Sequence, residues 1–256
     1  MKITFLGTCA CDFSPKLKNE YKNSFDKNAR RSSAMLINDR FLVDCGPHTL
    51  EALKIAGKDV SLITDLFITH LHSDHFNPAN VNELAKDRSE PLRVWVREDA
   101  LTEGLENVTV MLMRQFKSYE IESGSRVIAL PANHDNKAYP RHLFFEVNGK
   151  TAFYGCDGAW MINSTYYFLK DKKLDLAVLD CTTGDYEGDF RMGEHNSIPM
   201  LRVMLPSLRT FKVIDEHTEV YFSHLAPSLH ASHDETVLIA AEMGAKVAYD
   251  GLEINI

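Results

Sequence analysis

The stretch Thr69-His70-Leu71-His72-Ser73-Asp74-His75 places three histidines and one aspartate within six residues. It directly follows the apolar run Leu66-Phe67-Ile68, which predicts a buried strand, so the polar side chains stand where the strand ends and the chain turns. Residues two apart on an extended backbone point to the same face, so His70 and His72 can both reach one ion. The turn then swings Asp74 and His75 toward a second position. Because imidazole nitrogen and carboxylate oxygen suit zinc, iron or manganese, the stretch predicts a metal site.

Three further segments place a possible ligand directly after a predicted strand. These ligands are His134, Asp157 and His224. Each is a weak signal when taken singly, but together with the first cluster they complete two sites. The first site would use His70, His72, His134 and Asp157, and the second would use Asp74, His75, His224 and the other oxygen of Asp157. A shared carboxylate would help to hold two ions about 3.5–4 Å apart, the spacing of two-metal hydrolytic sites.

Composition and charge limit the classes of protein to which the chain can belong. It has 256 residues, of which 45% are hydrophobic and 25% charged, and no linker rich in Pro, Gly or Ser divides it. We therefore expect one domain over residues 1–256. The formal net charge of −8 argues against a broad basic surface for nucleic acid or anionic lipid. It leaves room for a small anionic substrate, because metal ions can be the largest local charges in a site.

The termini and the cysteines predict a soluble cytoplasmic protein. The first residues show no secretory signal, and no apolar run reaches the roughly 18 residues that span a bilayer. The odd number of scattered cysteines fits free thiols better than a disulfide framework. They are Cys9, Cys11, Cys45, Cys156 and Cys181.

The remaining pattern predicts two sheets packed face to face with helices outside, in the α/β (α+β) class. Hairpins are expected across Asn38-Asp39 and Asn148-Gly149, which suit tight turns. Helices are expected at residues 49–56, 78–86, 197–205 and 235–243. The polar residues 14–32 show no apolar periodicity and predict a long loop, and loops of that length are usually functional or mobile.

Taken in order along the chain, these residues resemble the metallo-β-lactamase superfamily. The motifs that carry the resemblance are Gly7-Thr8, Asp44-Cys45-Gly46, His70-x-His72-x-Asp74-His75, His134, Asp157 and His224. The resemblance implies an αββα sandwich with the metals at one edge of the sheets. It also implies that Asp74 both binds metal and orients the nucleophilic water. The superfamily contains lactamases, glyoxalases, lactonases, phosphodiesterases and nucleases, so the fold alone does not choose a substrate.

Two further segments are similar to the phosphoribosyl cyclic phosphodiesterase branch of the superfamily. They are Leu179-Asp180-Cys181-Thr182 with the later His195-Asn196, and the terminal Asp250-Gly251-Leu252-Glu253. The loop histidine of that branch is held to act in catalysis, which implies such a role for His195. That branch also holds a structural zinc on a cysteine-rich insertion near its N-terminus. Residues 12–30 contain no cysteine, so that zinc is not expected here.

The first hypothesis is therefore a metal-dependent phosphodiesterase that acts on a small cyclic or linear phosphodiester. Two divalent ions (Zn, Mn or Fe) would bridge a hydroxide that attacks phosphorus, with Asp74 orienting it. His195 would protonate the departing alkoxide. The expected partner is a small anionic substrate, with no nucleic acid and no membrane. Relatives in the superfamily often dimerise, so a homodimer is compatible with this hypothesis.

Three alternatives remain. A lactone, thioester or β-lactam hydrolase could use the same metals without His195. An RNA-processing endonuclease shares the ligands, but no insertion resembles the protruding tRNA arm of those enzymes and the net charge of −8 opposes it. A structural metal protein would have a closed site and would not need two ions.

Two further groups carry weaker predictions. Arg30 and Arg31, beside the polar loop, would either contact a phosphate or lie on a solvated surface. His230 and His233 would either border the pocket or belong to the start of the last helix. The Ser-x-x-Glu pattern of residues 232–235 predicts a capping box there.

Overall fold

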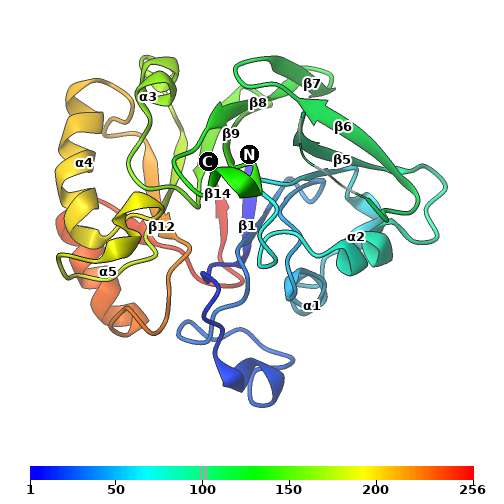
Figure 1. Cartoon of the computed structure of the whole chain (residues 1–256), viewed down its shortest axis with the longest axis horizontal. Coiled ribbons are helices and arrows are strands. Elements are labelled where there is room, and N and C mark those ends of the chain that lie inside the picture. Colours follow the sequence, from blue (N-terminus) through cyan, green and yellow to red (C-terminus); the bar gives the residue numbers. More distant parts are fainter. Residues whose placement is uncertain (99, 101–102) are drawn as a thin grey trace.

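The strands form two sheets that pack face to face, and helices cover both outer faces (Figure 1). The structure is a computed structural model that describes residues 1–98, 100 and 103–256. The first sheet has the order β14-β1-β2-β3-β4-β5-β6 and the second the order β13-β12-β11-β10-β9-β8-β7. This is the predicted αββα arrangement.

The first sheet contains β1 (Lys2–Gly7), β2 (Ala34–Ile37), β3 (Phe41–Val43), β4 (Asp65–Phe67), β5 (Leu92–Arg97), β6 (Val108–Met113) and β14 (Glu253–Asn255). The second contains β7 (Ser118–Glu122), β8 (Ser125–Pro131), β9 (Arg141–Val147), β10 (Lys150–Gly155), β11 (Leu176–Asp180), β12 (Glu219–Ser223) and β13 (Lys246–Val247). The helices are α1 (Thr49–Ile55), α2 (Pro78–Ala85), α3 (Asn163–Leu169), α4 (Ile198–Thr210) and α5 (His233–Glu242). Short 3₁₀ turns lie at η1 (Pro15–Lys18), η2 (Val60–Leu62), η3 (Asn136–Ala138) and η4 (Phe190–Gly193).

Both predicted hairpins are confirmed. Asn148 (φ 52°) and Gly149 (φ 77°) join β9 to β10, and positive φ at both central residues is what a two-residue type I′ turn requires. Asn38 (φ 50°), Asp39 (φ 58°) and Arg40 join β2 to β3, where Ile37 pairs with Phe41. Asn, Asp and Gly adopt positive φ at the lowest cost.

Strand direction brings the predicted ligands to one edge of the sheets. In the second sheet, β8, β10, β11 and β12 run the same way, because β8 and β10 both pair antiparallel with β9 while β10, β11 and β12 pair in parallel. Their carboxyl ends therefore share one edge. Segments that follow strands far apart in the sequence meet there.

Aromatic packing between the sheets fixes the strand that precedes the histidine cluster. Phe67 is fully buried, with its ring centroid 5.2 Å from that of Phe145 on the opposite sheet and 5.8 Å from that of Trp95 on the neighbouring strand. Such pairs add about 0.5–1.5 kcal/mol beyond the burial of their area. Because Phe67 lies three residues before His70, this packing sets where the cluster begins.

Helix α4 is longer than predicted. It begins at Ile198, after the N-cap Ser197, as expected, but it continues through Pro206 to Thr210 instead of ending at residue 205. Proline removes one backbone hydrogen bond and usually ends a helix. Here the buried face continues past it with Leu208, which is 1% exposed. Tertiary packing therefore overrides the local signal.

The two arginines beside the polar loop are buried, so the prediction of a solvated surface is wrong for both. Residues 14–32, blue at the foot of Figure 1, form a loop that contains only η1. At its end, Arg30 and Arg31 are 3% and 0% exposed. Arg31 Nη2 lies 2.7 Å from Glu51 Oε1, and its Nη1 lies 3.9 Å from Asp250 Oδ2. The arginines join the loop to α1 and to the C-terminal segment.

The capping box predicted for the last helix is confirmed. Ser232 accepts a hydrogen bond from the backbone of Glu235, and the Glu235 side chain accepts one from the backbone of Ser232.

All five cysteines are free, and only Cys11 is exposed. Among the described residues, no helix is both long enough and apolar enough to cross a membrane.

Candidate metal centre

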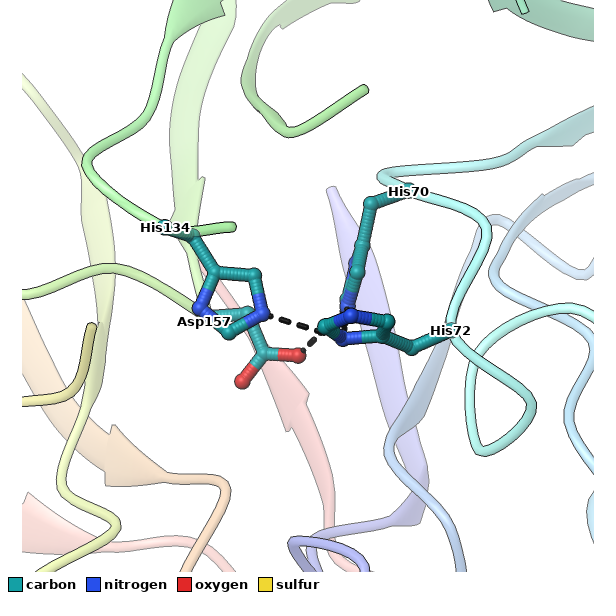
Figure 2. A group of neighbouring side chains, drawn as sticks. All are labelled: His70, His72, His134 and Asp157. Atoms are coloured by element: carbon teal, nitrogen blue, oxygen red, sulfur yellow. Dashed lines mark hydrogen bonds and ion pairs between the residues drawn. The ribbon is translucent and has the colours of Figure 1, made fainter. Parts of the chain in front are cut away.

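The first predicted group of ligands converges on Asp157 (Figure 2). His70 Nε2 lies 2.9 Å from Asp157 Oδ2 and 3.1 Å from His72 Nδ1, and His134 Nε2 also lies 3.1 Å from His72 Nδ1. The candidate ligand atoms of all four residues lie within 4.8 Å of one another. His70, His134 and Asp157 are buried, while His72 is half-buried. The segments that follow β4, β8 and β10 thus meet at this site.

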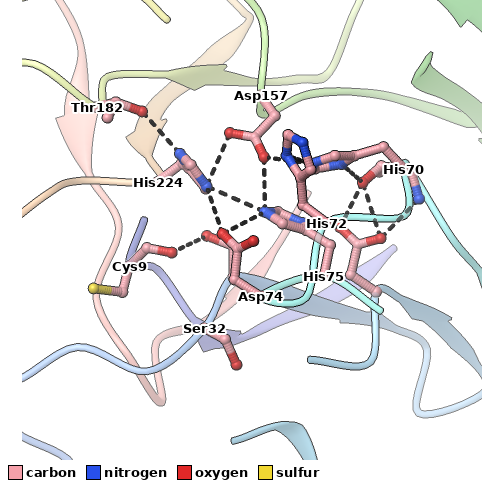
Figure 3. Close-up of polar contacts among 12 residues, drawn as sticks. Cys9, Ser32, His70, His72, Asp74, His75, Asp157, Thr182 and His224 are labelled. Carbon is pink, nitrogen blue, oxygen red and sulfur yellow. Dashed lines mark hydrogen bonds and ion pairs between the residues drawn. The ribbon is translucent and has the colours of Figure 1, made fainter. Parts of the chain in front are cut away.

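The second predicted group shares the same aspartate (Figure 3). His75 Nε2 lies 2.8 Å from Asp157 Oδ2, and His224 Nε2 lies 2.9 Å from Asp157 Oδ1. Asp74 Oδ2 lies 3.4 Å from His75 Nε2 and 3.8 Å from His224 Nε2. These four residues also have candidate ligand atoms within 4.8 Å of one another. The structure therefore brings all seven predicted ligands together.

Hydrogen bonds on the outer side of the imidazoles direct their inner nitrogens into the centre. His134 Nδ1 donates to the carbonyl oxygen of Glu194 at 3.2 Å, so its Nε2 is left as a lone pair. His75 Nδ1 lies 2.7 Å from Asp44 Oδ2, and His224 Nδ1 lies 2.8 Å from the hydroxyl of Thr182. Metal-binding histidines almost always have such a partner on the other ring nitrogen.

The charges of the centre keep its carboxylates ionised. Burial opposes ionisation of Asp157, but His224, His75 and His70 outweigh it and hold its pKa well below the usual range. Burial also opposes ionisation of Asp74, and His75 and His224 again hold its pKa below the usual range. An ionised carboxylate is the form that binds a cation.

The donor set fits divalent metal ions. Asp157 Oδ1 is buried and receives no hydrogen bond of acceptable geometry from the described residues. Five imidazoles and two carboxylates face one another with no cysteine among them. Zinc, manganese and iron accept such nitrogen and oxygen ligands. These residues could therefore hold metal ions.

Three residues of the centre have a left-handed backbone, which non-glycine residues rarely adopt. They are Asp44 (φ 64°), Asp157 (φ 56°) and His224 (φ 59°). Such strain costs of order 1–3 kcal/mol each and gathers at functional sites. Beside Asp44, a Cβ on Gly46 would lie 1.8 Å from the carbonyl oxygen of Asp74. Only glycine allows this approach, which explains the glycine of the Asp-Cys-Gly motif.

His195 reaches the centre and is held there by Asp180 and Thr182. Its Nδ1 lies 3.1 Å from Asp180 Oδ2, 3.1 Å from Thr182 Oγ1 and 3.4 Å from Asp157 Oδ1. Burial opposes protonation of His195, but the carboxylate of Asp180 outweighs it and raises the pKa of His195. The sequence analysis marked the segment Leu179-Asp180-Cys181-Thr182 as part of a family resemblance but assigned no role to Asp180 or Thr182.

The guanidinium of Arg141 clamps the strand end that carries the histidine cluster. Arg141 is 1% exposed; its Nε donates to Ile68 O at 2.8 Å, its Nη2 donates to Trp95 O, and its backbone N–H donates to Thr69 O at 3.1 Å. Lysine lacks the planar fork that makes these bonds. We expect Arg141→Lys to weaken metal binding about 10- to 100-fold, the usual cost of losing an orienting partner outside the ligands. Competition with a chelating dye measures this affinity.

Arg126→Lys is the matched control for that change, because the Arg126 side chain is 56% exposed and pairs with Glu146 far from the cluster. An unchanged affinity in Arg141→Lys, equal to that of the control, would show that the clamp does not position the ligands.

His142 is buried behind the turn that follows Asp157, and both its ring nitrogens lack a hydrogen-bond partner among the described residues. Burial lowers its pKa from 6.5 to about 4. Unfolding therefore takes up a proton between these pH values, and stability falls as the pH falls through them. At about 1.4 kcal/mol per pH unit, the loss reaches about 3 kcal/mol. We expect the free energy of unfolding of His142→Leu to rise relative to that of wild type as the pH falls from 6.5 to 4.

Urea unfolding of both proteins at several pH values, in the same metal state, measures this difference. His217→Leu is the control, because the His217 side chain is 85% exposed and should leave the pH dependence unchanged. A constant difference between His142→Leu and wild type would contradict the prediction.

Sequence comparisons with known proteins match part of the chain. The family model of the anti-Pycsar protein Apyc1 matches residues 1–88. A ribonuclease Z of Methanothermobacter thermautotrophicus is 31% identical over 98 residues, which are 37% of this chain. The match spans only 29% of the length of that relative.

Solved structures match nearly the whole chain. The metallo-β-lactamase fold protein YhfI from Bacillus subtilis has a TM-score of 0.75 at 14% identity, covering 99% of this chain and 98% of that one. A diphosphatase from the PhnP family has a TM-score of 0.74 at 18% identity, covering 99% and 96%. Zn²⁺-bound PqqB from Methylobacterium extorquens has a TM-score of 0.70 at 15% identity, covering 100% of both chains. The chain therefore has the metallo-β-lactamase fold, but these likenesses do not select the phosphoribosyl cyclic phosphodiesterase branch.

Proposed function

We propose that this protein is a metal-dependent hydrolase that cleaves a small cyclic or linear phosphodiester. The observation that carries the proposal is the position of His195. Its Nδ1 is held by Asp180 Oδ2 at 3.1 Å, and it lies 3.4 Å from the aspartate that the two ligand groups share. A candidate proton donor thus stands beside a candidate two-metal centre. The similarity to a diphosphatase of the PhnP family supports phosphorus chemistry.

Two divalent ions would be held by the two groups, with Asp157 common to both. The first group is His70, His72, His134 and Asp157, and the second is Asp74, His75, Asp157 and His224. Ions bound there supply Lewis acidity, which neutralises phosphate oxygens and makes water a better nucleophile. The structure of PqqB contains Zn²⁺, so zinc is the first metal to test.

The residues of the chain would orient the water and move one proton. The Asp74 carboxylate, ionised beside His75, can accept a hydrogen bond from the attacking water and fix its direction. Since His195 Nδ1 is engaged by Asp180, its Nε2 is the nitrogen left to meet the substrate. As the P–O bond to the leaving group breaks, His195 gives its Nε2 proton to the departing oxygen. Asp180 keeps the imidazole in the same orientation throughout.

RNA processing is the second candidate, because ribonuclease Z is the relative with 31% identity over 98 residues. The net charge of −8 opposes it, since affinity for a polyanion depends on neutralising phosphates with Lys and Arg. Hydrolysis of a lactone, thioester or β-lactam could use the same metals without His195, so the position of His195 favours it less.

The test is turnover of bis(p-nitrophenyl) phosphate and of a cyclic ribose phosphate by protein loaded with Zn²⁺ or Mn²⁺. A panel of lactones, thioesters, a β-lactam and a precursor tRNA is run beside them. Cleavage of both diesters supports the proposal. Turnover confined to the carbonyl panel or to the RNA would replace it with the corresponding alternative.

A further inference from the structure

A polar cavity, separate from the candidate metal centre, lies next to Leu225, the residue that follows the candidate ligand His224. It has a volume of about 170 Å³ and lies between the end of the 14–32 loop and the segment that leads into α5. Its polar lining includes Arg30, His230 and His233, and no Asp or Glu is among the lining residues. Ala231 and Ser232 on its rim are exposed, so the cavity opens to solvent there.

Arg30 brings a buried positive charge to this cavity. Its side chain has neutral acceptors only: Nη1 donates to Thr8 Oγ1 and to Ala248 O, both at 2.6 Å, and Nη2 donates to His233 Nδ1 at 2.9 Å. No carboxylate lies within ion-pair distance of Arg30 in the part of the chain that the structure describes. The carboxylate of Asp250 stands behind Thr8, where it accepts from the Thr8 hydroxyl and from the backbone of Arg31.

The neutral ring of His233 and a helix end add hydrogen-bond donors to this cavity. Because His233 Nδ1 accepts from Arg30, the proton of its neutral ring is on Nε2, which is a donor. His230 Nε2 donates to Cys181 O at 2.8 Å, which fixes that ring against the cavity wall. The N-terminus of α5, ten residues long, begins at His233 and carries the partial positive end of the helix dipole.

We propose that this cavity binds a small oxyanion of the size of phosphate or sulfate, with Arg30 as its principal binding group. A guanidinium pairs strongly with such anions, because its planar N–H groups match two oxygen atoms at once. The volume of 170 Å³ equals that of several waters at about 30 Å³ each, which leaves room for a tetrahedral oxyanion. A metal cation is excluded as the occupant, because the lining offers positive charge and no carboxylate. The bound oxyanion joins the polar loop to the start of α5.

The direct test is a crystal of the metal-loaded protein soaked in selenate, whose selenium gives an anomalous signal. The expected result is a peak in the cavity beside Arg30, separate from any peak at the metal centre. A peak at the metal centre alone, or none at all, would overturn the proposal. A cavity peak that remains in Arg30→Gln would mean an adventitious ion only.

A titration of sulfate, followed by calorimetry in a background of constant ionic strength, tests the site in solution. Arg30→Lys is expected to bind about 10- to 100-fold more weakly, the fold-change for losing a hydrogen bond to a charged group. His233→Leu is a second variant that leaves Arg30 in place and removes the Nε2 donor from the lining, so it should also bind more weakly. Lys27→Gln is the matched control, because it removes one exposed charge from the same loop outside the cavity and should bind as wild type.

Asp157→Ala separates the cavity from the metal centre, where sulfate can also bind. Binding that persists in Asp157→Ala and weakens in Arg30→Lys supports the cavity. Binding that is lost in Asp157→Ala and unchanged in Arg30→Lys places the anion at the metals and refutes the proposal.

Discussion

Replacing Asp157 with alanine is expected to abolish diester hydrolysis and to reduce the content of both metal ions together. Asp157 Oδ2 lies 2.9 Å from His70 Nε2 and 2.8 Å from His75 Nε2, and its Oδ1 lies 2.9 Å from His224 Nε2. No other residue belongs to both ligand groups. Loss of a partner outside the ligands already costs roughly 10- to 100-fold in metal affinity, and loss of the shared carboxylate should exceed that. Metal analysis after dialysis, with turnover measured in the same samples, gives the result.

The matched control for this change is Asp234→Ala. Asp234 lies in the first turn of α5, is exposed and belongs to neither ligand group. It should keep most of its metal and turnover. If Asp157→Ala lost only one ion, or kept its rate, the two groups would not share a ligand and the two-metal proposal would fail.

The four ligands that lie close together in the sequence were predictable, because one strand end carries all of them. His70, His72, Asp74 and His75 come from one strand end, so the strand and its turn suffice to gather them. His134, Asp157 and His224 come from three other strands, and the sequence could only mark each as a residue after a strand. They meet because β8, β10 and β12 run in the same direction, which the order of residues alone does not reveal.

The residues that orient the ligands were not predictable from the same signals. Thr182 holds His224 Nδ1 at 2.8 Å, yet a threonine after a strand is common and carries no mark of this role. Asp180 closes an apolar strand, and its contact with His195 depends on how the loop after it returns to the centre. Arg141 acts through backbone carbonyls, which any residue supplies. These roles exist only in three dimensions.

Two predictions were wrong, a solvated surface for Arg30 and Arg31 and an earlier end for helix α4, and both have the same origin. Two adjacent arginines in a polar stretch resemble a solvated surface, but Arg31 pairs with Glu51 and lies near Asp250, some two hundred residues further along. Helix α4 passes Pro206 because its apolar face stays buried on the second sheet. In both cases a distant contact decides the structure, and local composition cannot report it.

Replacing His195 with alanine is expected to slow hydrolysis of a cyclic ribose phosphate about 10²–10⁴-fold, the usual contribution of a positioned general acid. The rate on bis(p-nitrophenyl) phosphate should change much less, because nitrophenolate leaves readily without a proton. The metal content should stay near that of wild type, since the seven residues of the two predicted ligand groups do not include His195. The two substrates therefore separate proton donation from metal binding within one variant.

His217→Ala is the control for that result, because its exposed side chain lies near Glu216 and outside the ligand groups. Equal losses on both substrates in His195→Ala, with metal retained, would mean that the histidine positions the substrate or the water instead of protonating the leaving group. Loss of metal would make it a ligand, since its Nδ1 and Asp180, Asp157 and His224 also form a group within 4.8 Å. Only a loss confined to the poor leaving group supports His195 as the acid, because only that step depends on the basicity of the departing oxygen.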